Sequence, residues 1–125
     1  MISASQNVSD LLHRTADALA AQGSVPVSPG RIEQDGRSLC AGAALVYQAA
    51  ESTLARSDLD LLAREMIAGG KESIVAAGMR FNLDPHLVGE AIRKNDSCND
   101  EERSENMIRF LKDLASRTGE PALLD

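Results

Sequence analysis

The most apolar stretch of the chain, LCAGAALVYQAAESTL at residues 39–54, is built largely from small side chains. Ala43, Val46 and Ala50 recur at helical spacing on one face. Gly42 and its neighbouring alanines let a second backbone approach closely. Aromatic residues make up only 2% of the chain, so Ala, Leu, Val, Ile and Met must fill the core. Such a core suits closely packed helices, and we predict an all-α domain with this helix at its centre.

The other segments also show helical periodicity, and their ends are marked by capping residues, Gly or Pro. Gly69-Gly70 is expected to break or kink the third helix, and Asp84-Pro85 is a strong helix start. We expect these further helices over residues 8–22, from 57 to the Gly pair, over 71–81, from 85 to about 94, and from about 100 to 117.

The whole chain is predicted to form a single domain, residues 1–125, of the size that buries a core without disulfides. Its architecture is predicted as a compact bundle of five to six helices. The Pro- and Gly-containing segment 24–38 is expected to be a small irregular or hairpin insert, because Asp35-Gly36 is a typical tight turn. Residues 1–6 and 120–125 are expected to fray.

The charge balance favours some partners over others. The formal net charge is −6, and the acids are concentrated towards the C-terminal end. An acidic surface repels phosphate backbones and anionic lipid, so we expect no nucleic acid and no membrane partner. The start of the chain lacks the features of a secretory signal, and two cysteines are too few for a disulfide framework. We therefore expect a cytoplasmic protein with reduced thiols.

The stretch IRKNDSCND, residues 92–100, contains two Asn-Asp pairs around a cysteine. A helix joint accounts for most of it. Asn95 can adopt the left-handed conformation that often ends a helix. Asn99 with Glu102 three residues later resembles a capping box for the next helix. Asp100 and the two glutamates after it then fall in the first turn, where acids are favoured.

A metal site is a weaker interpretation of the same residues. A calcium loop that starts at Asp96 would place Glu101 where a Gly is needed and Met107 where the last Glu is needed. The residues that zinc prefers are few and scattered along the chain: His13, Cys40, His86 and Cys98. We expect no metal and no cofactor.

A cysteine-dependent enzyme is a sharper alternative. Cys40 lies near the start of the central helix, where the helix dipole lowers a thiol pKa. His86 could act as its base, with Asn95 or Asp96 as the group that orients the base. The competing interpretation is that Cys40 is a small buried residue that packs as alanine does.

Residues 74–94 can also be read as a helix-turn-helix, with a turn near Asn82. Its second helix would present His86, Gly89, Glu90 and Arg93, and a DNA-binding regulator is therefore another alternative. The stretch LDPHLVGEAIRKND is similar to the LDPxLVxAIxxES stretch of lytic transglycosylases. In that family the Glu is the catalytic acid. Asn95 stands there in this chain, so the acid chemistry does not carry over.

Three short motifs follow one another along the chain: Asp35-Gly36-Arg37, then Cys40-Ala41-Gly42-Ala43 at the start of a helix, then Asn95-Asp96 before a terminal amphipathic helix. In these motifs the chain resembles an uncharacterised family of small bacterial proteins. The family usually has a Trp before the Asn-Asp, where this chain has Lys94. The resemblance implies no activity, but it groups Cys40, Asn95 and Asp96 as one constellation. We expect a non-enzymatic interaction module that binds a protein partner or a second copy of itself.

Overall fold

The computed structural model describes residues 4–27 and 38–119, and all regular structure within them is helical. The five helices are α1 (Ala4–Gln22), α2 (Ala41–Glu51), α3 (Arg56–Arg80), α4 (Pro85–Ser97) and α5 (Arg103–Gly119). The predicted all-α bundle is confirmed. The first helix begins at Ala4, which is earlier than predicted and takes in part of the segment expected to fray. The hairpin expected at Asp35-Gly36 and the frayed tail 120–125 lie outside the described residues.

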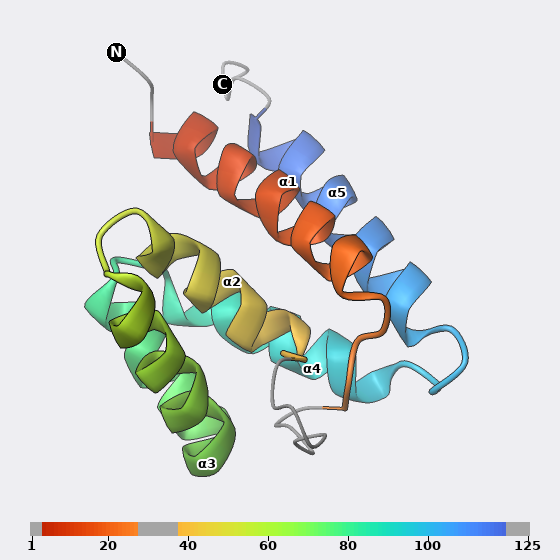
Figure 1. Ribbon diagram of the computed structural model, residues 1–125. Coiled ribbons are helices and arrows are strands. Elements are labelled where there is room, and N and C mark those ends of the chain that lie inside the picture. Colours follow the sequence, from red (N-terminus) through yellow and green to blue (C-terminus); the bar gives the residue numbers. More distant parts are fainter. Residues whose placement is uncertain (1–3, 28–37, 120–125) are drawn as a thin grey trace.

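Helices α1 and α5 lie side by side and run in opposite directions (Figure 1). Near one end of the pair, Ser9 Oγ donates to the carbonyl of Ala115 at 3.0 Å. Near the other end, the N–H of Val25, just after α1, donates to Ser104 Oγ at 2.9 Å. Helices α2, α3 and α4 form the rest of the bundle, and α2 contacts α1 as well as α3 and α4.

The central position predicted for α2 is confirmed, because every residue from Ala41 to Val46 is buried. A Cβ atom added at Gly42 would lie 2.5 Å from Cγ1 of Ile92, so only glycine permits this approach of α2 to α4. Gly78 plays a similar part in α3, where an added Cβ would lie 3.1 Å from a methyl group of Val88. The small residues therefore set the distances between helices α2, α3 and α4.

Helix α3 reverses direction at the predicted glycine pair. Gly70 has φ 79° and ψ −160°, a conformation that is essentially restricted to glycine. Arg80 Nη2 lies 3.5 Å from Glu65 Oε1, although the two residues are 15 positions apart. A straight helix would separate their backbones by about 22 Å. Helix α3 is therefore a helical hairpin, and both of its ends lie at the same end of the element in Figure 1.

The start of α4 also follows the sequence prediction. Asp84 Oδ1 accepts a hydrogen bond from the N–H of His86 at 2.9 Å, and Pro85 occupies the first helical position. Asn82, in the turn before it, has the left-handed φ of 65° that asparagine tolerates well.

Within the described ranges, no helix has both the length and the apolar character needed to cross a bilayer.

Candidate functional site

Asn95 is a fully buried residue within α4. The prediction that Asn95 ends this helix is therefore wrong. Asn95 Oδ1 accepts a hydrogen bond from the N–H of Ala41 at 3.0 Å, and its Nδ2 donates to the carbonyl of Pro26 at 2.9 Å. The side chain therefore ties three segments together: α4, the start of α2, and the chain that leaves α1. The helix continues to Ser97, with Cys98 as its C-terminal cap.

The contact with Ala41 explains why an amide is needed at this position. The first N–H groups of a helix have no partner within the helix. The residue at the N-cap of α2 is Cys40, whose side chain makes no capping hydrogen bond. Asn95 supplies the missing acceptor from another helix. This is a structural task, and both ends of the amide are used in it.

Arg103 also belongs to the joint between α4 and α5, and its role there was not predicted from the sequence. Its side chain is buried, and its guanidinium donates to the carbonyl of Asn95 from Nε at 3.0 Å and to that of Cys98 from Nη2 at 2.7 Å. Nη1 donates to the exposed carboxylate of Asp100 at 2.8 Å. Arg103 thus satisfies carbonyl groups at the end of α4. A basic residue directly after an acidic run, where the helix dipole disfavours it, was the available signal.

The predicted capping box is wrong, because α5 begins at Arg103 and not near residue 100. The N–H of Glu102 donates to the backbone carbonyl of Asn99 at 3.1 Å, so residues 99–102 form a turn. Arg103 then stands at the start of α5 and reaches back to the end of α4 from this first turn. The broader interpretation of residues 92–100 as a helix joint agrees with these contacts.

Asp96 makes a different kind of contact from its neighbour Asn95. Its Oδ2 lies 2.5 Å from Nζ of Lys71 in the second half of α3, while Oδ1 is buried and has no hydrogen-bond partner among the described residues. About a quarter of the side chain is exposed, and more than half of Lys71 is exposed. Such a pair contributes about 0–1 kcal/mol to stability. Asp96 therefore links α4 to α3 and takes no part in the hydrogen bonds of the Asn95 amide.

The proposed catalytic residues are spread along the structure. Cys40 is only 2% exposed, and the hydrogen bond from Asn95 reaches its neighbour Ala41. His86 is exposed in the first turn of α4, and the rise of the helix separates it from Asn95 by about 13 Å. The structure thus brings Asn95 to the Cys40 segment, whereas His86 lies more than two turns away along α4. A buried thiol is poorly placed to meet a substrate.

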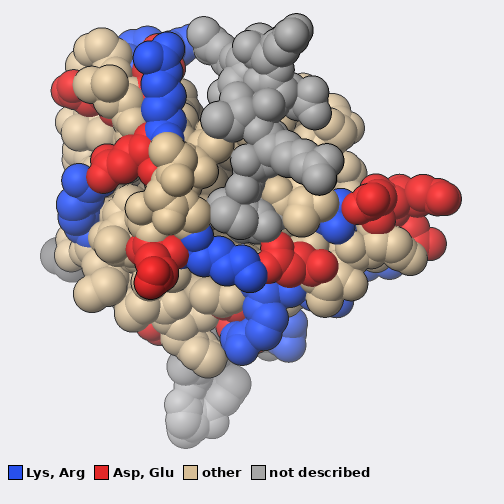
Figure 2. Space-filling view, turned by 90° about the horizontal axis from the view of Figure 1, so that it is seen from below, with Lys and Arg blue, Asp and Glu red and all other residues tan. Residues whose placement is uncertain are grey.

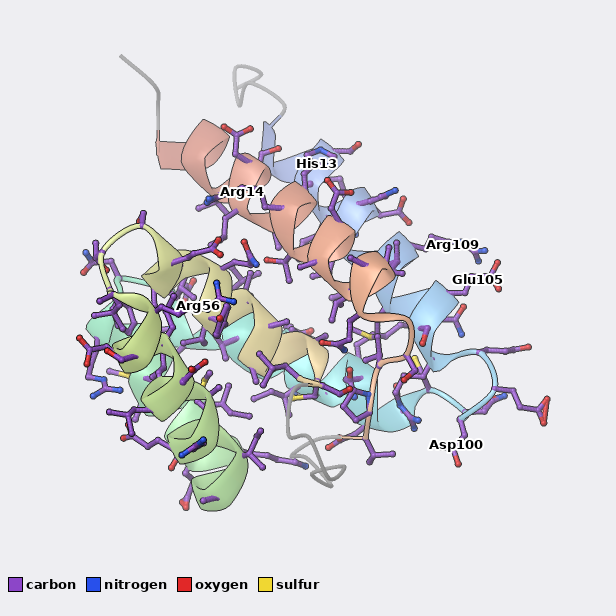
Figure 3. The ribbon with its side chains drawn as sticks, in the orientation of Figure 1. His13, Arg14, Arg56, Asp100, Glu105 and Arg109 are labelled. Carbon is purple, nitrogen blue, oxygen red and sulfur yellow. The ribbon has the colours of Figure 1, made fainter. Side chains whose placement is uncertain are left out.

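The residues considered for metal binding show no common site. His13 lies on the exposed side of α1 (Figure 3), and Cys98 is buried with its thiol 3.2 Å from the carbonyl of Lys94. Among the residues that the structure describes, no three His, Cys, Asp or Glu side chains gather closely enough to hold a metal ion.

The helix-turn-helix alternative has the predicted order of helix, turn and helix, but the charge pattern around it is mixed. The second half of α3 leads through the turn at Asn82 into α4, as predicted. On α4, Arg93 is ion-paired with Glu90, so its charge is balanced locally. Figure 2 shows acidic and basic side chains interspersed on the face seen from below. A DNA-binding face would instead gather basic side chains.

The outer side of α3 is unusual because it carries large apolar side chains that are exposed to solvent. Leu61 is 61% exposed and Met79 is 57% exposed, the highest values among the large apolar side chains. Leu61 lies off the buried and half-buried apolar stripe of the first half of α3, which comprises Leu59, Leu62, Ala63, Met66 and Ile67. An apolar residue off the buried stripe is the feature of the sequence that indicates this surface.

Each half of α3 carries a continuous stripe of exposed residues, and we call the two stripes together the α3 face. The first stripe is Ser57, Asp58, Leu61, Arg64, Glu65 and Ala68. The second is Glu72, Ala76, Met79 and Arg80.

Comparisons of the chain with protein-family models, with curated proteins and with solved structures gave no significant match.

Proposed function

We propose that this protein is a non-enzymatic interaction module that binds another protein through the α3 face. The observation that carries the proposal is the exposure of two large apolar side chains, Leu61 and Met79, on one element. Scattered apolar residues are normal on protein surfaces, so a binding surface requires that these two side chains belong to one patch.

The hairpin geometry places the two side chains at the same level. Leu61 precedes Gly70 by as many residues as Met79 follows it, so antiparallel halves bring both to a similar distance from the turn. The Arg80–Glu65 ion pair spans the two halves. Glu65 lies one turn from Leu61 on its stripe, and Arg80 is next to Met79. The two stripes therefore form one surface, with an apolar side chain on either side of an ion pair.

The residues of the helix joint also support the proposal, because their side chains serve the fold. Cys40 is buried, and the two ends of the Asn95 amide hold the start of α2 and the segment after α1 against α4. The motifs around Cys40 and Asn95, on which the resemblance to the uncharacterised family partly depends, thus have a role in folding, and membership of that family remains our proposal. Cys40 and Cys98 are both buried thiols, which also fits a reducing compartment such as the cytoplasm.

The experiment is site-specific photo-crosslinking in the cells that make the protein. A photoreactive amino acid at position 61 should give covalent adducts with another polypeptide. The same residue at position 109 is the control, because Arg109 projects from the outer side of α5 (Figure 3). Adding Met79→Asp to the position 61 variant should remove the adducts. Equal adducts at positions 61 and 109, or none at 61, would contradict the proposal.

A further inference from the structure

We propose that the protein bound at the α3 face is a second copy of this chain, packed with its α3 antiparallel and with the two Leu61 side chains at the two-fold axis. This inference rests on the proposed function and adds the identity of the partner. It comes from the charge pattern around Leu61.

A two-fold axis at Leu61 fixes which residues meet. The position three residues before Leu61 on one copy faces the position three residues after Leu61 on the other copy. Asp58 therefore faces Arg64 of the partner subunit, and Arg64 faces the partner's Asp58. Both residues are exposed. Neither forms an ion pair with any other residue that the structure describes, so both are available for these contacts.

The apolar side chains complete the match. Leu61 meets its own copy at the axis, where the contact is best shielded from water. Met79 lies at the same level on the neighbouring half of the hairpin, and its flexible side chain adapts to the facing surface. The result is an apolar centre flanked by two symmetric ion pairs. Because the face comprises only two helical stripes, we expect a reversible dimer that depends on concentration.

Sedimentation velocity over a concentration series tests this arrangement by charge exchange. Asp58→Arg alone and Arg64→Asp alone should each weaken dimerisation about tenfold or more, because each places two like-charged pairs across the interface. The double variant Asp58→Arg/Arg64→Asp should restore dimerisation, because opposite charges face each other again. Leu61→Asp should abolish it.

The matched control is Arg109→Glu, a charge reversal on the outer side of α5 that should leave dimerisation unchanged. Circular dichroism melts must show that every variant is folded at the temperature of the measurement. A wild-type chain that stays monomeric up to millimolar concentration would overturn the inference, and so would a double variant as weak as the single variants. Adducts from position 61 with a different polypeptide would then leave the proposed function standing and refute only the second copy.

Discussion

Replacing Asn95 by alanine should destabilise the fold strongly, even though it changes a single neutral side chain. The variant removes the acceptor for the Ala41 N–H, which is buried at the start of α2. A buried donor left without a partner costs about 1–3 kcal/mol. It also removes the hydrogen bond to the Pro26 carbonyl, worth about 0.5–1.5 kcal/mol, since that residue is only half-buried and water can replace the lost donor. We expect a total loss of about 2–4 kcal/mol in the free energy of unfolding.

Urea denaturation followed by circular dichroism measures this loss, and the chain contains its own control. Asn99 belongs to the second Asn-Asp pair but is exposed in the turn before α5. Asn99→Ala should change the free energy of unfolding by less than about 0.5 kcal/mol. Equal effects of the two variants, or an Asn95→Ala variant as stable as the wild type, would refute the account of Asn95 as a cap supplied from another helix.

Three further variants or measurements test other parts of the structure. Arg103→Met should lower the free energy of unfolding by about 1–3 kcal/mol, because buried carbonyls of α4 lose their donor, whereas Arg109→Met should be nearly neutral in the same urea titration. Gly70→Ala should cost about 1–3 kcal/mol in a thermal melt, because alanine is strained at φ 79°. Cys40 should react with a thiol reagent slowly in the native state and rapidly in urea, and fast native labelling would contradict its burial.

The sequence predicted the elements whose signals are local. Gly69-Gly70 marks the reversal of α3 because the required backbone conformation is a property of glycine itself. Asp84 and Pro85 mark the start of α4 because a cap and its N–H lie two residues apart. The apolar small residues of α2 predicted its central place, since burial follows directly from composition and spacing.

The helix joint could not be predicted in the same way. The hydrogen bonds of Asn95 reach residues 54 and 69 positions away, and nothing near Asn95 in the sequence indicates them. Locally, asparagine after a basic pair indicates a helix end, and tertiary contacts override that tendency. The α3 face could not be predicted for another reason: Leu61 becomes exceptional only once the reversal at Gly70 brings the half of α3 that carries the exposed Met79 back alongside its own half.

The most direct test of the central claim follows the side-chain methyl signals of Leu61 and Met79 by nuclear magnetic resonance. The unmodified protein is measured from micromolar to millimolar concentration. These two signals should shift with concentration, while methyl signals of residues buried in the α1–α5 pair, such as Leu111, should stay constant. Leu61 and Met79 signals that do not change, or changes confined to other helices, would contradict the claim that the α3 face is where this chain meets its second copy.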